Sequence, residues 1–138
     1  MKKIFLIILL FFFAACDGKI YNQVHDKSQI GAKIRNIEII ASDEFSLKAS
    51  KNFLIKKGFK IEKSDYILRV EYRDYKKTCT NPLSKTSSDY SYDGLVSITL
   101  FYKNSKVHSS YRDFKGDLKE NLFTPLINSM ISDLEISF

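Results

Sequence analysis

The stretch YILRVEYRDY, residues 66–75, decides the fold of this chain. Apolar or aromatic residues occupy every second position, and charged residues fill most of the positions between them. The first set is Tyr66, Leu68, Val70 and Tyr72, and the second is Arg69, Glu71 and Arg73. Because successive side chains of a strand point to opposite faces of a sheet, the pattern predicts a strand with one buried and one solvated face.

Further strands are predicted on both sides of this stretch. Residues 95–102 alternate in the same way, and a turn at 103–106 leads into a returning strand at 107–114. These two strands predict an antiparallel hairpin. Before the central stretch, residues 33–40 predict a strand and residues 59–61 a short one.

Two helices are predicted, one on each side of the strand-rich region. Ser42 and Asp43 compete as N-cap of the first, which ends at Gly58, a residue able to take the left-handed cap conformation. Its expected apolar stripe is Phe45, Leu47, Ala49, Phe53 and Leu54.

The second helix has two alternative starts. Asp117 and Glu120 have the spacing of a capping pair, in which case Pro125 kinks the helix. Alternatively, Thr124 is the cap and Pro125 the first helical residue. The expected apolar stripe is Leu122, Leu126, Ile127, Met130, Ile131 and Leu134.

These elements predict an α+β fold in a single domain spanning residues 33–138. A helix between two strands favours a parallel pair joined by a right-handed crossover. Two amphipathic helices and a one-sided sheet bury their apolar faces only against each other. We therefore expect a two-layer sandwich, with a mixed, mostly antiparallel sheet of four to five strands and two helices on one face.

The N-terminal segment FLIILLFFFAACDGK, residues 5–19, predicts a cleaved signal peptide, because its apolar run is shorter than the roughly 20 residues of a membrane-spanning helix. The motif Phe13-Ala14-Ala15-Cys16 resembles the lipobox of bacterial lipoproteins, with Phe at a position where Leu is usual. The resemblance implies cleavage between Ala15 and Cys16, loss of residues 1–15, and lipid on the Cys16 sulfur. Two or more acyl chains hold a protein firmly in a bilayer.

The segment from residue 16 to residue 32 is polar and shows little periodicity, which predicts a flexible tether that sets the domain about 20 Å from the bilayer. An aspartate directly after the lipidated cysteine, as at Asp17, retains lipoproteins in the inner membrane of enteric bacteria. We nevertheless expect this protein in the outer membrane, facing the periplasm. Cys79 is the only other cysteine, so no intramolecular disulfide is expected. A shielded thiol, an intermolecular bridge and a reactive thiol stay open as alternatives.

No catalytic, cofactor or metal signature follows the signal peptide. His25 and His108 have no second ligand at metal spacing, and the five glycines stand singly, unlike a phosphate-binding loop. We therefore expect a protein that is not an enzyme and that holds no cofactor or metal.

Surface charge suggests one candidate binding face. The net charge is +6, and it falls to +4 without Lys2 and Lys3, which is low for a dedicated nucleic-acid binder. Several basic residues lie on or next to the predicted strands. They indicate either a solvated sheet face or a site for an anionic ligand, such as lipid phosphates or an acidic partner. The residues of the predicted anionic-ligand face are Arg69, Arg73, Lys76 and Arg112. Tyr90-Ser91-Tyr92 predicts either an aromatic patch or ordinary strand packing.

A series of short motifs resembles the YajG-like family of small bacterial lipoproteins over roughly residues 37–135. They are Gly58-Phe59-Lys60-Ile61, Asp65-Tyr66-Ile67-Leu68-Arg69-Val70, the strand pair, and Asn128-Ser129-Met130-Ile131-Ser132-Asp133. The resemblance implies an envelope lipoprotein without catalytic residues. The element order is also similar to the lipopolysaccharide-assembly lipoprotein LptE, a two-helix sandwich that plugs an outer-membrane barrel, although this chain is shorter than usual for that family.

We therefore expect a lipid-anchored, non-catalytic binding or scaffold lipoprotein that acts through protein contacts in envelope assembly or maintenance. Its expected partners are the membrane and an envelope protein, with no nucleic acid. The alternative is an LptE-like accessory of lipopolysaccharide export that contacts an outer-membrane barrel and lipopolysaccharide. A third hypothesis, a surface-displayed host-contact protein, differs from both in its topology.

Overall fold

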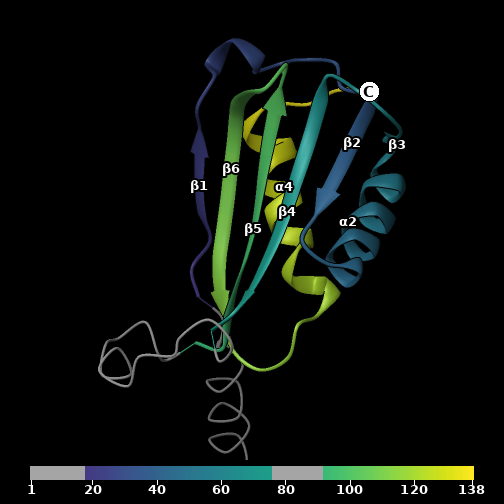
Figure 1. Ribbon diagram of the computed structural model, residues 1–138. Helices are drawn as coiled ribbons and strands as arrows, with labels where there is room; N and C mark the ends of the chain where they lie inside the picture. The colour runs from purple at the N-terminus through teal and green to yellow at the C-terminus, as the bar shows by residue number, and fades with distance from the viewer. Residues whose placement is uncertain (1–17, 76–91) are drawn as a thin grey trace, which may run out of the picture.

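A six-stranded sheet forms one layer of the molecule and two helices form the other (Figure 1). The computed structural model describes residues 18–75 and 92–138. The predicted two-layer α+β sandwich is confirmed, with one strand more than the upper expected number. Both helices lie on the same face of the sheet (Figure 1).

The strands are arranged around the central antiparallel pair. Their bounds are β1 (Tyr21–Val24), β2 (Asn36–Ala41), β3 (Lys60–Ile61), β4 (Tyr66–Asp74), β5 (Gly94–Tyr102) and β6 (Ser105–Phe114). The spatial order is β1-β6-β5-β4-β2-β3. The neighbouring pairs β1–β6, β6–β5 and β5–β4 are antiparallel. Strand β2 is parallel to both β4 and β3, and the helix between β2 and β3 had predicted a parallel pair.

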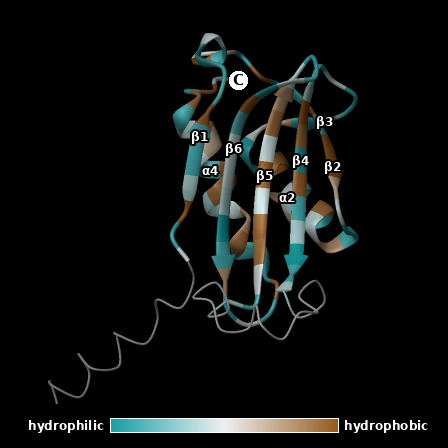
Figure 2. Ribbon diagram, turned by 60° about the vertical axis from the view of Figure 1, so that its left-hand side comes forward, coloured by the Kyte–Doolittle hydropathy of each residue, from teal (hydrophilic) through white to brown (hydrophobic). Residues whose placement is uncertain are grey.

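The alternation in the sequence matches the burial of the central strands. Leu68 lies opposite Leu100 and Val70 opposite Ile98, and all four side chains are fully buried. Figure 2 shows hydrophobic residues alternating with hydrophilic ones along β4 and with residues of intermediate hydropathy along β5. The inward side chains of this pair therefore form the centre of the core.

The hairpin between β5 and β6 turns through only two residues. Lys103 and Asn104 have φ values of 46° and 68°, and this pair of left-handed residues matches the right-handed twist of the flanking strands. The predicted turn at 103–106 is therefore shorter than expected, and β6 begins at Ser105.

Helix α2 (Glu44–Lys57) has the predicted ends but a different buried face. Asp43 is the N-cap and accepts a 2.8 Å hydrogen bond from the Ser46 backbone N–H, while Gly58 caps the C-terminus with φ 104°. Phe45 and Leu47 are 42% and 38% exposed, so their assignment to the core stripe was wrong. The buried residues of the helix are Ser46, Ala49, Ser50 and Leu54, whose small members allow the helix to approach the sheet closely.

Helix α4 (Thr124–Asp133) follows a short 3-10 turn, η4 (Glu120–Leu122). Phe123 occupies the cap position and Pro125 lies in the first helical turn. The second predicted start is therefore correct to within one residue, and no helix begins at the Asp117 capping position. The buried side chains of this segment are Leu122, Phe123, Leu126, Ile127, Met130 and Leu134.

Residues 18–32 are not the flexible tether that the sequence predicted. β1 pairs with β6 as an edge strand, and the 3-10 turn η1 (Lys27–Gln29) follows it. The buried Ser110 hydroxyl donates a 2.6 Å hydrogen bond to the Asn22 side chain, and Val24 packs against the core. These contacts make residues 18–32 part of the folded domain, which extends beyond the predicted start at residue 33.

Candidate functional site

The second face of the sheet carries no helix, and we call it the open face. Its strands are β1, β6, β5 and β4, which lie in front of the two helices in Figure 1. The cross-strand register sets which side chains share this face. They are Tyr21, Gln23, Ile67, Arg69, Glu71, Arg73, Leu95, Ser97, Thr99, Phe101, Lys106, Ser109, Tyr111 and Asp113.

A shallow trough of about 250 Å³ lies at the centre of the open face. Small hydroxyl side chains form its floor because Ser97, Thr99 and Ser109 occupy adjacent outward positions on β5 and β6. Larger side chains on both sides, including Glu71 and Tyr111, stand above this floor. The trough is therefore a direct result of small residues placed between large ones in the register.

Aromatic and cationic side chains are held in fixed positions around the trough. Tyr21 and Tyr111 stack with ring centroids 5.0 Å apart and planes 17° apart, yet they remain 50% and 41% exposed. The Arg69 guanidinium lies 5.1 Å from the centroid of the Phe101 ring. Both pairs present large ordered side chains to solvent, and such pairs contribute cross-strand stabilisation as well.

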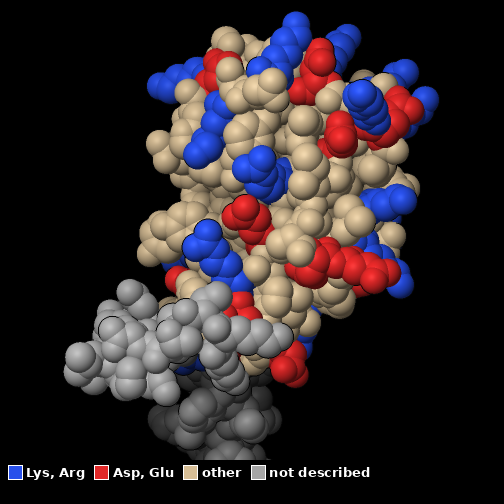
Figure 3. Space-filling model, in the orientation of Figure 1, with Lys and Arg blue, Asp and Glu red and all other residues tan. Residues whose placement is uncertain are grey.

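The predicted anionic-ligand face is only partly assembled. Arg69 and Arg73 lie on the open face, with Glu71 between them on the same strand. Arg112 lies opposite the buried Val96 and therefore points to the helix side, where it donates a 3.2 Å hydrogen bond to the Gly18 carbonyl. Lys76 lies outside the described residues. Figure 3 shows basic and acidic side chains interspersed, with uncharged residues between them.

The structure brings together a histidine and a serine that the sequence did not link. His25 Nε2 lies 2.8 Å from the Ser109 hydroxyl at the edge of the open face. Nucleophilic catalysis also needs a third group that orients the base and donors that stabilise an oxyanion. Among the described residues, the hydrogen bonds of His25 and Ser109 include no carboxylate on the other ring nitrogen. The pair joins β6 to the residue that follows β1.

His108 is paired inside the domain. It is fully buried on β6, and its Nε2 lies 2.8 Å from Oδ2 of Asp133 at the end of α4. Burial lowers the pKa of His108, and the hydrogen bond and charge of Asp133 offset this only in part. A spacing of 25 residues between different elements gave no sequence signal for the pair. Because His108 has no access to solvent, it ties the sheet to α4 and is unavailable to a ligand.

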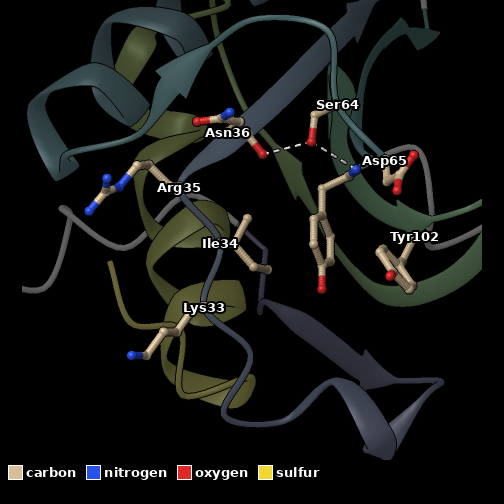
Figure 4. A pocket seen from close by; sticks show the side chains of 8 residues that line it. Lys33, Ile34, Arg35, Asn36, Ser64, Asp65 and Tyr102 are labelled. Atoms are coloured by element: carbon tan, nitrogen blue, oxygen red, sulfur yellow. Dashed lines mark hydrogen bonds between the residues drawn. The ribbon is translucent and has the colours of Figure 1, made fainter.

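A second hollow, of about 350 Å³, lies at the end of the sheet near the turn between β5 and β6 (Figure 4). Figure 4 shows Lys33 and Arg35 pointing away from Tyr102, whereas Ile34 points toward the tyrosine side. The Tyr66 hydroxyl donates a 2.6 Å hydrogen bond to Gln29. The cations do not converge and the lining is bonded to the fold, so this hollow is a packing feature.

The Tyr66 hydroxyl also stays in its neutral form. Burial raises the pKa of Tyr66, and the neighbouring Tyr102, Asp26 and Asp65 raise it further. The Tyr66 and Tyr102 ring centroids are 4.5 Å apart. A neutral, hydrogen-bonded phenol is suited to holding η1 against the sheet and gives no general base at physiological pH.

A third hollow, of about 110 Å³, is bordered by Asp74, Asp93 and Asp117 at the other end of the sheet. Of these carboxylates, Asp93 accepts a 2.7 Å hydrogen bond from the Gly116 backbone N–H. Within residues 18–75 and 92–138, no three His, Cys, Asp or Glu side chains are placed to hold a metal ion.

Comparison with known proteins adds no relative: no protein-family model, curated protein or solved structure matches this chain. The likeness to the YajG-like and LptE families therefore stays a prediction. In the part of the chain that the structure describes, no helix is both long and apolar enough to cross a membrane. Cys16, Cys79 and Tyr90 lie outside the described residues.

Proposed function

We propose that this protein is a lipid-anchored, non-catalytic lipoprotein of the bacterial envelope that binds a protein partner through the open face of its sheet. The observation that carries the proposal is the contrast between a helix-covered face, which is packed, and an open face with ordered, exposed aromatic and charged side chains. The lipobox at Cys16 supports the membrane anchor.

The composition of the open face favours a polypeptide as the partner. Tyrosine and arginine are enriched in protein interfaces and among the residues that dominate their binding energy. Tyr111 and Tyr21 are exposed, and Arg69 and Arg73 stand on the neighbouring part of the face. Tyr21 and Tyr111 are held by stacking on each other and Arg69 by its contact with the Phe101 ring, so these three side chains lose little conformational entropy when a partner binds.

The charge pattern gives less support to the LptE-like alternative. Recognition of lipid phosphates uses converging cations, most effectively arginine forks. Glu71 lies between Arg69 and Arg73, and Arg112 points to the other side of the sheet. A partner with charges of both signs complements this face better than a polyanion does.

Site-specific photocrosslinking in intact cells tests the proposed face. A photoreactive amino acid at Tyr111 is expected to capture a discrete envelope protein, whereas the same group at Ile55, an exposed residue on α2, is not. Capture at Ile55 but not at Tyr111 contradicts the proposal. Capture of lipopolysaccharide at Tyr111 would favour the alternative function.

Substitution of Cys16 tests the anchor separately. Cys16→Ser is expected to abolish lipid attachment and to leave an uncleaved precursor, because the sulfur carries the lipid that precedes cleavage in lipoproteins. Immunoblotting of separated membrane and soluble fractions measures the size and location of the product, with Cys79→Ser as the matched control. A Cys16→Ser protein of mature size in the soluble fraction would contradict lipidation.

A further inference from the structure

We infer that the domain is held against the bilayer by one end of its sheet, with almost no spacer between lipid and fold. This inference rests on the proposed lipidation of Cys16. We call this end the anchored pole and define it by Gly18, Tyr75, Tyr92, Asp113 and Lys115. Backbone hydrogen bonds connect the region: Gly18 N–H bonds to Asp113 O at 2.8 Å, and Tyr75 N–H bonds to Asp93 O at 3.0 Å.

Gly18 is fixed to the fold by both of its backbone polar groups. Its N–H donates to the Asp113 carbonyl, and its own carbonyl accepts from the Arg112 guanidinium at 3.2 Å. A Cβ at this position would lie 3.0 Å from the Asp113 carbonyl oxygen, so the close approach suits glycine. Three residues later β1 begins and pairs with β6. The chain is thus part of the sheet from residue 18 onward.

The length of chain between the lipid and this fixed point is very small. Only Asp17 separates Cys16 from Gly18. An extended chain spans at most about 3.3–3.6 Å per residue, so Gly18 lies within about 7 Å of the lipidated residue. The coil tether predicted from the sequence would have allowed about 20 Å. The anchored pole therefore stays at the level of the lipid headgroups.

The anchored pole also has side chains suited to a headgroup surface. The Lys115 ammonium lies 5.8 Å from the centroid of the Tyr92 ring, and Tyr75 donates a hydrogen bond to Asp113. Tyrosine and lysine are favoured where an apolar membrane meets water. These groups lie at the ends of strands other than β1, so they give the domain a second point of contact beside the lipid.

Two contacts at one pole set the domain upright on the membrane. β4, β5 and β6 contain 9, 9 and 10 residues and run between the two ends of the sheet, which is a length of about 30 Å at roughly 3.3 Å per residue. The β5–β6 turn lies at the far end (Figure 1). The open face then looks sideways, along the membrane, toward other membrane-attached proteins.

Fluorescence energy transfer from the domain to labelled headgroups tests this orientation. The lipidated protein carries Cys79→Ser and one new cysteine, either Asp117→Cys near the anchored pole or Ser105→Cys at the far end; both positions are exposed. In phosphatidylethanolamine and phosphatidylglycerol vesicles, transfer is expected to be strong from position 117 and weak from position 105. Equal transfer from both positions would overturn the inference.

A spacer variant provides the matched control. An insertion of about ten Gly and Ser residues between Asp17 and Gly18 is expected to reduce the difference between the two labels, because the domain then moves freely. An unchanged difference would also overturn the inference. Mass spectrometry of Cys16 and flotation with the vesicles report lipidation independently: a protein that lacks lipid refutes the proposed function and this inference with it, whereas a lipidated protein with equal transfer refutes the inference alone.

Discussion

The two faces of the sheet use the same strands for different purposes. On the helix side, β4 and β5 present fully buried aliphatic side chains such as Leu68, Ile98 and Leu100. On the open side, the intervening positions hold small hydroxyl residues and exposed charged or aromatic ones. The difference teaches that one alternating stretch can supply the stability of the fold with one half of its residues and leave the other half available for binding.

The largest expected difference in the free energy of unfolding is between variants of two adjacent residues of β5 whose side chains lie on opposite faces of the sheet. Leu100→Ala, on the covered face, is expected to lower the free energy of unfolding by about 2–5 kcal/mol through lost burial and a cavity. Thr99→Ala, on the open face, is expected to change it by less than about 0.5 kcal/mol. Urea unfolding monitored by circular dichroism measures both. Equal losses would refute the division of labour between the faces.

A smaller effect is expected at the cap of the helix that covers the inner face. Asp43→Ala removes hydrogen bonds from the Ser46 N–H and hydroxyl and should cost about 1 kcal/mol. Burial raises the pKa of Asp43, but the hydrogen bonds from Ser46 and Ser42 outweigh it, so the folded pKa lies below 3.8. The contribution is therefore present above pH 3.8 and is lost as the pH falls through the folded pKa. Urea unfolding at neutral and acidic pH measures it, and Glu44→Ala is the control; a pH-independent loss would contradict this account.

The buried histidine is expected to give a further pH dependence. Burial lowers the pKa of His108 below 6.5 in spite of Asp133, with nearby His25 adding to the decrease, so the fold favours neutral imidazole. As the pH falls below 6.5, the unfolded chain takes up a proton that the folded chain resists, and stability decreases. His108→Gln should flatten this dependence between neutral and mildly acidic pH, whereas His25→Gln should keep it. Thermal unfolding across that range decides, and a slope that survives His108→Gln refutes the assignment.

A small effect on stability is also expected from an aromatic side chain of the open face. Tyr111→Ala removes a stacked cross-strand pair with Tyr21 and should cost no more than about 1 kcal/mol. The same variant should lose the protein partner, as measured by co-purification from crosslinked cells. Gln23→Ala, at the edge of the face, is a matched control that should keep it. A Tyr111→Ala protein that is folded and retains its partner would place the binding surface elsewhere.

Local patterns predicted the parts of the fold that depend on local physics. The alternation in β4 and β5 and the left-handed glycine at the end of α2 each involve neighbouring residues, so they are visible in the sequence. The apolar spacing of α4 is also local, and all but Ile131 of its predicted stripe is fully or nearly fully buried. The fold class followed because these elements bury their apolar faces only as two layers.

Features that depend on distant partners were missed. β1 is a polar edge strand, and its fit depends on Asn22 meeting Ser110, 88 positions away. On α2, Ser46 and Ser50 are buried whereas the larger Phe45 and Leu47 are exposed, so hydrophobicity alone did not identify the side of the helix that faces the sheet. Of the predicted anionic-ligand face, Arg112 was misplaced because the pairing of β5 with β6 shifts by one residue between Leu100 and Phe101, and beyond this shift Arg112 lies opposite the buried Val96.

The short edge strand β1 has a consequence for solubility. It covers only four residues of β6, which is ten residues long. If β1 were detached, for example by proteolysis beyond Gly18, β6 would present a long unpaired edge with free backbone groups. Such an edge is a template for pairing between copies, so β1 acts as a guard against aggregation. The strand that follows the proposed lipid anchor would thus also keep neighbouring copies from joining their sheets.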